Sequence, residues 1–91
     1  MKSFKTSTQY RKDLKRYKNN PSKLADLKEV LDILQKGQPL PAKYFPHNLH
    51  GEYKDCMECH IQGDFLLIWI DEANEIIELV RLGSHAELFG K

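Results

Sequence analysis

The sequence lacks any long apolar run. The longest uninterrupted one covers residues 65–70, whereas an α-helix needs about 20 apolar residues to cross a bilayer. Residues 1–6 are mostly polar, so the apolar segment of a secretion signal is also missing there. We therefore expect no membrane association and a cytoplasmic location.

Cysteine is scarce as well, with only Cys56 and Cys59. Together with His60 they fit C-x-x-C-H, the pattern of covalent haem attachment. Haem attachment requires export, and residues three apart on a strand point to opposite faces, so the two thiols should diverge. No second C-x-x-C pair supplies the four ligands of structural zinc. We therefore interpret Cys59 as a small core residue and Cys56 as a free thiol, and we expect neither a metal nor a cofactor.

Acidic residues are almost absent from the first 23 positions, which carry eight basic side chains and one acidic one, a net charge of +7. The remaining residues carry a net charge of −6, so the overall charge of +1 hides a strong asymmetry. Such a division indicates one surface for a polyanion. The alternative is a solvated basic helix face. The chain shows no repeat or linker, and we expect one domain over residues 1–91.

Two helices are predicted after a short strand around Phe4. Thr6, Ser7 and Thr8 are the candidate N-cap residues of the first helix, and Thr6 and Gln9 have the spacing of a capping box. The apolar residues of this helix then recur at helical intervals. The second helix begins after Asn20 and Pro21 and ends near Gly37. A short joint should make the pair an antiparallel hairpin. The apolar stripes are Tyr10, Leu14 and Tyr17 in the first helix, and Leu24, Leu27, Leu31 and Leu34 in the second.

Strands follow a proline-containing loop over residues 38–51. Tyr53, Met57, Cys59 and Ile61 share one parity and predict the core-facing side of a strand, with Glu58 and His60 on the other side. Residues 65–70 are apolar at both parities, as in a central strand buried on both faces. Residues 76–82 form a further strand, and the tail forms a helical turn or an edge. The fold class is thus α+β, in the order β-α-α-β-β-β, with an antiparallel sheet of about four strands covered on one face by the helix hairpin and open on the other.

Five residues with proton or phosphate chemistry converge in this topology. The hairpin turn after residue 62 places the end of one strand beside the start of the buried strand at residues 65–70. The strand at residues 76–82 runs antiparallel to the buried strand, so its end lies at the same edge of the sheet. RNA cleavage needs a base for the ribose 2′-hydroxyl, an acid for the departing 5′-oxygen and a cation for the phosphate. Histidine serves either proton role near neutral pH, and arginine matches phosphate oxygens. The candidate catalytic residues are His47, His60, Asp64, Arg81 and His85.

Each of these residues also has a structural reading. A histidine on a strand is often exposed or structural, and Arg81 has a possible salt-bridge partner in Asp64. We treat His50 as an ordinary surface residue. Phe89 near the terminus is compatible with simple packing.

The sequence as a whole resembles the YafQ branch of the RelE-type toxins. The similarity lies in residues 38–51, with the pattern P-L-x-x-x-Y-x-x-H-x-L, in residues 59–69, and in the ending R-x-G-[ST]-H-x-x-L-F at residues 81–89. It covers essentially the whole chain, and the β-α-α-β-β-β order agrees with it. One departure is Phe65, where a tryptophan often follows the aspartate.

The resemblance implies the toxin of a bacterial type II toxin–antitoxin pair, an endoribonuclease that cuts mRNA on the ribosome and is silenced by an antitoxin protein. It implies that His85 donates the proton to the leaving oxygen and that Arg81 holds the phosphate. His47, His60 and Asp64 then share base and orienting roles, and their ranking stays open. The side chains expected to contact RNA are Phe65, Phe89, Lys12, Lys15 and Arg16, the last three on the basic first helix.

Two other functions are compatible with the fold. A ParE-like protein would inhibit gyrase without catalysis and would have no use for the histidines. A simple RNA-binding module would depend on Lys15 and Arg16 rather than on the histidines.

Overall fold

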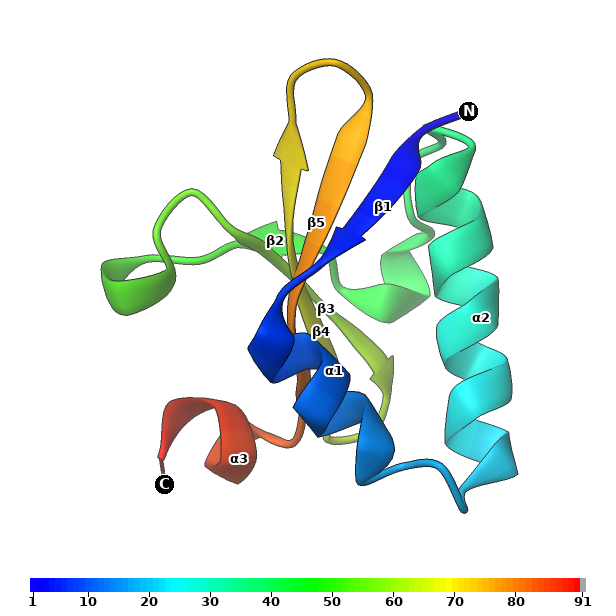
Figure 1. Cartoon of the computed structure of the whole chain (residues 1–91), viewed down its shortest axis with the longest axis vertical. Helices are drawn as coiled ribbons and strands as arrows, with labels where there is room; N and C mark the ends of the chain where they lie inside the picture. The colour runs from blue at the N-terminus through cyan, green and yellow to red at the C-terminus, as the bar shows by residue number, and fades with distance from the viewer. Residues whose placement is uncertain (91) are drawn as a thin grey trace.

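A computed structural model describes residues 1–90. The predicted order β-α-α-β-β-β is present, with one additional two-residue strand before the last three strands and a short helix at the end, and a five-stranded sheet forms the centre (Figure 1). The strands are β1 (Ser3–Thr6), β2 (His47–Asn48), β3 (Met57–Gln62), β4 (Phe65–Glu72) and β5 (Ile76–Gly83). The helices are α1 (Thr8–Lys15), α2 (Pro21–Gln35) and α3 (His85–Phe89), with 3₁₀ turns at Ala42–Tyr44 and Gly51–Tyr53.

The sheet differs from the expected one at both edges. Its strand order is β1-β5-β4-β3-β2, and β1 pairs in parallel with β5 while the other pairs are antiparallel. Hydrophobic periodicity identifies a strand but not the direction of its neighbour, so the parallel pair was not predicted. The additional strand that the sequence did not predict is β2, which has two residues and is too short to show an alternating pattern.

Local signals explain where the helices begin and end. Ser7, one of the three predicted N-cap candidates, caps α1, because its Oγ accepts a hydrogen bond from the Tyr10 backbone N–H at 2.9 Å. Asn20 caps α2 through the Lys23 N–H, and Pro21 occupies the first turn, as predicted. After α2, Gly37 adopts φ +71°, a conformation that favours glycine.

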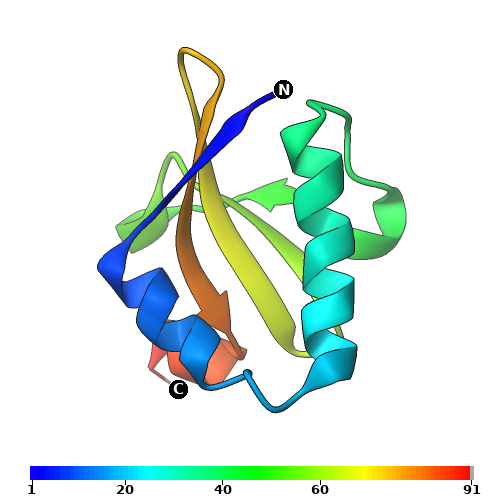
Figure 2. The same cartoon turned by 45° about the vertical axis from the view of Figure 1, so that its right-hand side comes forward.

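The two long helices cover one face of the sheet but do not form a tight hairpin. Figure 2 shows them diverging from their connection, with β4 visible between them. Helix α1 lies against β5, and α2 lies against β3. Their buried side chains form the main core with one face of the sheet, including Val30 of α2 and Leu67 and Trp69 of β4.

Strand β4 is buried on both faces, as its sequence predicted. Phe65, Leu67 and Trp69 pack under the helices, while Leu66 and Ile68 belong to a second cluster on the opposite face. All five side chains are at most 3% exposed. The strand is therefore the centre of the fold.

The second face is not left open, contrary to expectation. Cys56, Leu88 of α3 and the half-buried Tyr53 pack over Leu66 and Ile68 there. Tyr53 was predicted to face the main core, but β3 begins only at Met57, and Asp55 at φ +72° turns the chain before it. The parity of the strand therefore does not extend back to Tyr53. The tail forms the predicted helical turn, which brings Leu88 to this cluster.

The cysteine pair diverges as expected, with Cys59 in the main core and Cys56 in the second cluster. Both thiols are free, and burial raises the pKa of Cys59 to about 12. Within residues 1–90 no helix is both long and apolar enough to span a membrane.

Candidate active site

The pairing of the strands places the predicted site residues on the face of the sheet opposite α1 and α2, the face that carries Leu66 and Ile68. His47 pairs with Glu58, Glu58 with Ile68, and Ile68 with Arg81, so one row crosses four strands. In the next row on that face, His60 pairs with Leu66 and Leu66 with Gly83. Neighbouring strands are about 4.8 Å apart. Residues separated by more than 30 positions in sequence therefore lie over one floor, formed by Leu66 and Ile68.

The three predicted histidines form a continuous series. The ring centroid of His60 lies 6.2 Å from that of His47 and 5.7 Å from that of His85. The His85 ring is 6.0 Å from Phe89, whose ring is 5.7 Å from Tyr53. The Tyr53 hydroxyl accepts a hydrogen bond from Arg81 Nη1 at 3.3 Å. The predicted convergence of the imidazoles and the guanidinium on one face is therefore present, with Tyr53 and Phe89 between His85 and Arg81.

Asp64 orients His85. Its Oδ1 lies 2.7 Å from His85 Nδ1 and accepts the His85 backbone N–H at 2.9 Å. Because a carboxylate accepts only, Nδ1 carries the proton and Nε2 is left for other partners. The backbone and side-chain hydrogen bonds from His85 lower the pKa of Asp64, which keeps the orienting carboxylate ionised.

Glu58 is a site residue that the sequence analysis missed. Its strand parity predicted a solvent-facing side chain, but it is only 3% exposed. Its Oε1 lies 3.0 Å from His47 Nε2, and its Oε2 has no hydrogen-bond partner within residues 1–90. His47 Nδ1 lies 2.7 Å from the carbonyl oxygen of Phe45, which can only accept. Nδ1 therefore carries a proton, and a second proton must lie between Nε2 and Oε1, because two bare lone pairs would repel at that distance.

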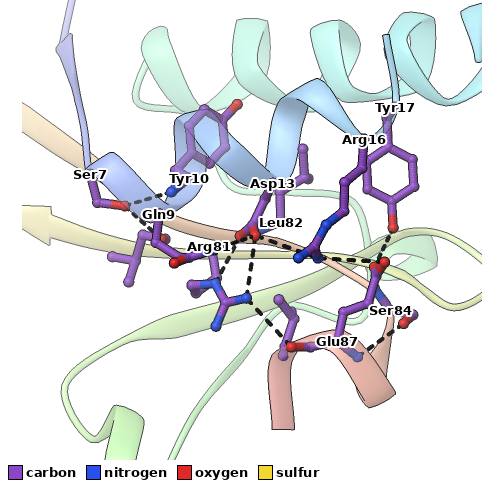
Figure 3. Close-up of polar contacts among 12 residues, drawn as sticks. Ser7, Gln9, Tyr10, Asp13, Arg16, Tyr17, Arg81, Leu82, Ser84 and Glu87 are labelled. Atoms are coloured by element: carbon purple, nitrogen blue, oxygen red, sulfur yellow. Dashed lines mark hydrogen bonds and ion pairs between the residues drawn. The ribbon is translucent and has the colours of Figure 1, made fainter. Parts of the chain in front are cut away.

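Arg81 is held by Asp13 rather than by Asp64. Its Nε donates to Asp13 Oδ2 at 2.8 Å and its Nη2 to Oδ1 at 3.3 Å (Figure 3). Asp13 is completely buried and also accepts the Leu82 backbone N–H at 3.0 Å. Burial alone would raise the pKa of Asp13, but the hydrogen bonds from Arg81, Leu82 and Gln9 outweigh it and lower the pKa. This fork fixes the guanidinium and leaves Nη1 toward Tyr53.

A second carboxylate, that of Glu87, ties α3 to the segment that follows α1. Glu87 Oε1 accepts the Tyr17 hydroxyl at 2.5 Å and the Ser84 backbone N–H at 2.9 Å, and Ser84 Oγ completes the capping box (Figure 3). These donors lower the pKa of Glu87. Gly83 makes the contact possible: it adopts φ +153°, and a Cβ there would lie 2.6 Å from Glu87 Oε1. The start of α3, which carries His85, is thereby fixed.

The residues predicted to contact RNA differ in their exposure to solvent. Phe65 is fully buried, with its ring 4.6 Å from that of Tyr17, so its prediction as an RNA-stacking residue is wrong for this conformation. Phe89 is 39% exposed and adjoins His85. Lys12 and Lys15 are exposed on α1, and Arg16 is exposed directly after it, with its Nη1 3.6 Å from Glu87 Oε2. Contact of these three with RNA stays a prediction.

The site also contains a set of metal-ligand atoms that was not expected. Glu58, His60 and His85 each offer one ligand atom, and the three atoms lie within 4.8 Å of one another. Imidazole nitrogen and carboxylate oxygen are ligands that suit zinc and other transition metals. The sequence did not indicate this set because Glu58 was assigned to solvent.

Known proteins share both the sequence and the fold. Residues 2–90 match the family described as the bacterial toxin of type II toxin–antitoxin systems, YafQ. The chain is 34% identical over 85 residues to the mRNA interferase toxin YafQ of Escherichia coli K12, covering 92% of this chain and 91% of that one.

Two solved structures extend the comparison. A metal-bound toxin from Helicobacter pylori is 43% identical, with a TM-score of 0.87 over 98% of this chain and 100% of that one. The Escherichia coli DinJ–YafQ complex contains a chain that is 30% identical, with a TM-score of 0.84 over 99% and 100%. Arg81, His85 and Phe89 lie within the matched residues 2–90. The chain therefore belongs to the YafQ family of bacterial type II toxin–antitoxin toxins.

Proposed function

We propose that this toxin is an endoribonuclease that cleaves mRNA by general acid–base catalysis. The observation that carries the proposal is the series of three imidazoles, with His85 held by Asp64 so that Nε2 is free. A gyrase inhibitor or a simple RNA-binding module would have no use for an oriented series of this kind.

The roles follow from the contacts. The His60 imidazole makes no hydrogen bond within residues 1–90 and lies between the other two imidazoles, so we assign it the removal of the 2′-hydroxyl proton. The 2′-oxygen then attacks the adjacent phosphorus, and the P–O5′ bond breaks. His85 enters this step as the doubly protonated imidazolium, with Nδ1–H held by Asp64, and its Nε2–H donates the proton that the departing 5′-oxygen needs. The products are a 2′,3′-cyclic phosphate and a 5′-hydroxyl end.

One cation balances the charge that develops on the phosphorus. Arg81, with Nη1 on the site side of its Asp13 fork, stabilises the phosphate oxygens. The pair of His47 and Glu58, which shares one proton, is neutral overall and lies beside His60 without adding net positive charge. Asp64, whose prediction left base and orienting roles open, takes the orienting role because its carboxylate is engaged by His85.

The ends of the cleaved RNA test this reaction. Brief induction in a host without an antitoxin should produce transcripts that end in a 2′,3′-cyclic phosphate, next to fragments that begin with a 5′-hydroxyl. Ligation-based mapping that is specific for each end distinguishes them from 3′-hydroxyl and 5′-phosphate ends. Arrest of DNA replication with intact transcripts would instead favour gyrase inhibition and refute the proposal.

In the proposed reaction, a bound metal would inhibit RNA cleavage and would not be required for it. Glu58, His60 and His85 fit a transition metal, and the relative from Helicobacter pylori is described as metal-bound. A metal there would occupy the nitrogens that move protons. We expect cleavage to persist in EDTA and to be abolished by saturating Zn²⁺, with recovery when EDTA is then added.

Calorimetry supplies the control for this prediction. Zn²⁺ should bind the wild-type protein and bind His85→Ala at least tenfold more weakly, since one of three ligands is lost. Loss of cleavage in EDTA, or faster cleavage with Zn²⁺, would contradict the assignment.

The partners follow from the family. DinJ binds YafQ in the Escherichia coli complex, and we propose that this chain likewise binds a cognate antitoxin. We also propose that it acts in the cytoplasm on ribosome-bound mRNA, with Lys12, Lys15 and Arg16 contacting ribosomal RNA. Such contacts predict binding that weakens steeply as salt is raised.

A further inference from the structure

Phe45 is an aromatic residue that the proposed reaction does not use. Its side chain is 66% exposed, and within residues 1–90 the only other exposed large apolar side chains are Met1 and Phe89. Phe89 already has a predicted role at the site. Single exposed apolar side chains are common on protein surfaces, so the neighbours of Phe45 decide whether its ring has a role.

The backbone at Phe45 does not favour this residue. Phe45 adopts φ +49° and ψ +51°, the left-handed conformation, in which residues with a bulky side chain are uncommon and glycine or asparagine is favoured. What the site needs from position 45 is its carbonyl oxygen, which accepts from His47 Nδ1. Any residue supplies a carbonyl, so the ring itself is not explained by the fold.

The position of the ring points to a ligand. Phe45 lies with its ring centroid 5.8 Å from that of His60, at an interplanar angle of 66°. From there the rings continue through His85, 5.7 Å from His60, to Phe89, 6.0 Å from His85. The two proton-transferring imidazoles are thus bracketed by two exposed phenyl groups, one at each end of the series.

We propose that Phe45 is a stacking platform for a nucleobase, so that the nucleotides on the two sides of the cleaved bond stack on Phe45 and Phe89. The inference rests on the proposed function, because it takes His60 and His85 to flank the reacting phosphate. Bases of single-stranded RNA are splayed and bind proteins by stacking on aromatic rings. Phe45 then replaces Phe65, which is buried, as the second aromatic contact with RNA.

Pairing protein variants with abasic RNA tests this role. The substrate is a short RNA with one cleavage site, made intact or with an abasic nucleotide at either position next to the cleaved bond. On the intact RNA, Phe45→Ala should lower kcat/KM by roughly 5- to 150-fold, the range that one stacked base provides. One of the two abasic RNAs should lower wild-type kcat/KM by a similar factor and should have no further effect on Phe45→Ala.

Matched variants separate stacking from other effects. Phe45→Tyr keeps an aromatic ring and should retain cleavage, whereas Phe45→Leu keeps apolar bulk and should behave like alanine. Phe89→Ala should show the same coupling with the other abasic RNA. All variants keep the backbone carbonyl that accepts from His47, and the Phe45 side chain is exposed, so folding should be preserved.

The outcomes are distinct. Coupling between Phe45 and one base supports the proposal. Equal losses for Phe45→Ala on all three RNAs, or no loss on any, would overturn it while leaving the ribonuclease function intact. Failure of the wild-type protein to cleave the intact RNA, both free and bound to ribosomes, would instead refute the proposed function.

Discussion

Replacing His85 with alanine is expected to slow RNA cleavage by about 10²- to 10⁴-fold, the usual contribution of a positioned acid or base. The variant should fold, because the His85 side chain is 55% exposed and its partner Asp64 is 60% exposed. Exposed pairs of this kind contribute at most about 1 kcal/mol. The rate is measured on a purified RNA, and the free energy of unfolding is measured in urea.

His50→Ala is the matched control for this variant. His50 is exposed two residues after the end of β2, the strand that carries His47, and lies outside the imidazole series. Its replacement should leave the cleavage rate unchanged. A His85→Ala protein that still arrests growth in the absence of an antitoxin would contradict the assignment of the acid.

Replacing Arg81 with alanine is expected to affect both activity and stability. Loss of the guanidinium removes the cation at the phosphate, which is worth about 10²- to 10³-fold in rate. It also leaves the carboxylate of Asp13, which is 0% exposed, without its main partner. An unpaired buried charge costs about 3–5 kcal/mol, a large part of the roughly 5–14 kcal/mol that stabilises a domain of this size. Urea unfolding and RNA cleavage measure the two effects.

The double variant Arg81→Ala, Asp13→Asn separates the two effects. Asparagine removes the unpaired charge and still offers an oxygen to the Leu82 N–H, so much of the lost stability should return. Activity should stay low, because the cation is still missing. Asp32→Asn, an exposed carboxylate on α2 that pairs with Lys28, is the control and should change neither quantity. Wild-type cleavage by the double variant would show that Arg81 does not act on the phosphate.

Much of the fold follows from short-range patterns. The run at residues 65–70 is apolar at both parities, and this is why β4 could be placed at the centre of the sheet. Caps and prolines similarly marked the start of α2. The pairing of β1 and the existence of β2 depend on long-range contacts, which periodicity does not reveal.

The same distinction applies to the site. The histidines and Arg81 are recognisable by residue type, and the resemblance in residues 81–89 assigns their roles. Asp13 is the single acid in a basic stretch, and nothing local indicates that it is buried against Arg81, 68 residues away. Glu58 was assigned to solvent by its parity, because the loop that covers it through His47 has no periodic signal. Phe65 was assigned to RNA by analogy, although its neighbours already implied a buried strand.

If His85 donates the proton to the leaving oxygen, a modified RNA whose leaving group needs no proton should restore cleavage by His85→Ala. In an RNA whose 5′-bridging oxygen at the cleaved bond is replaced by sulfur, the leaving group departs as a stable thiolate and needs no acid. His85→Ala should cleave this RNA nearly as fast as the wild-type protein does, while remaining slow on ordinary RNA. If the variant is equally slow on both substrates, His85 does not protonate the leaving oxygen, and the convergence of these side chains on one phosphodiester is wrong.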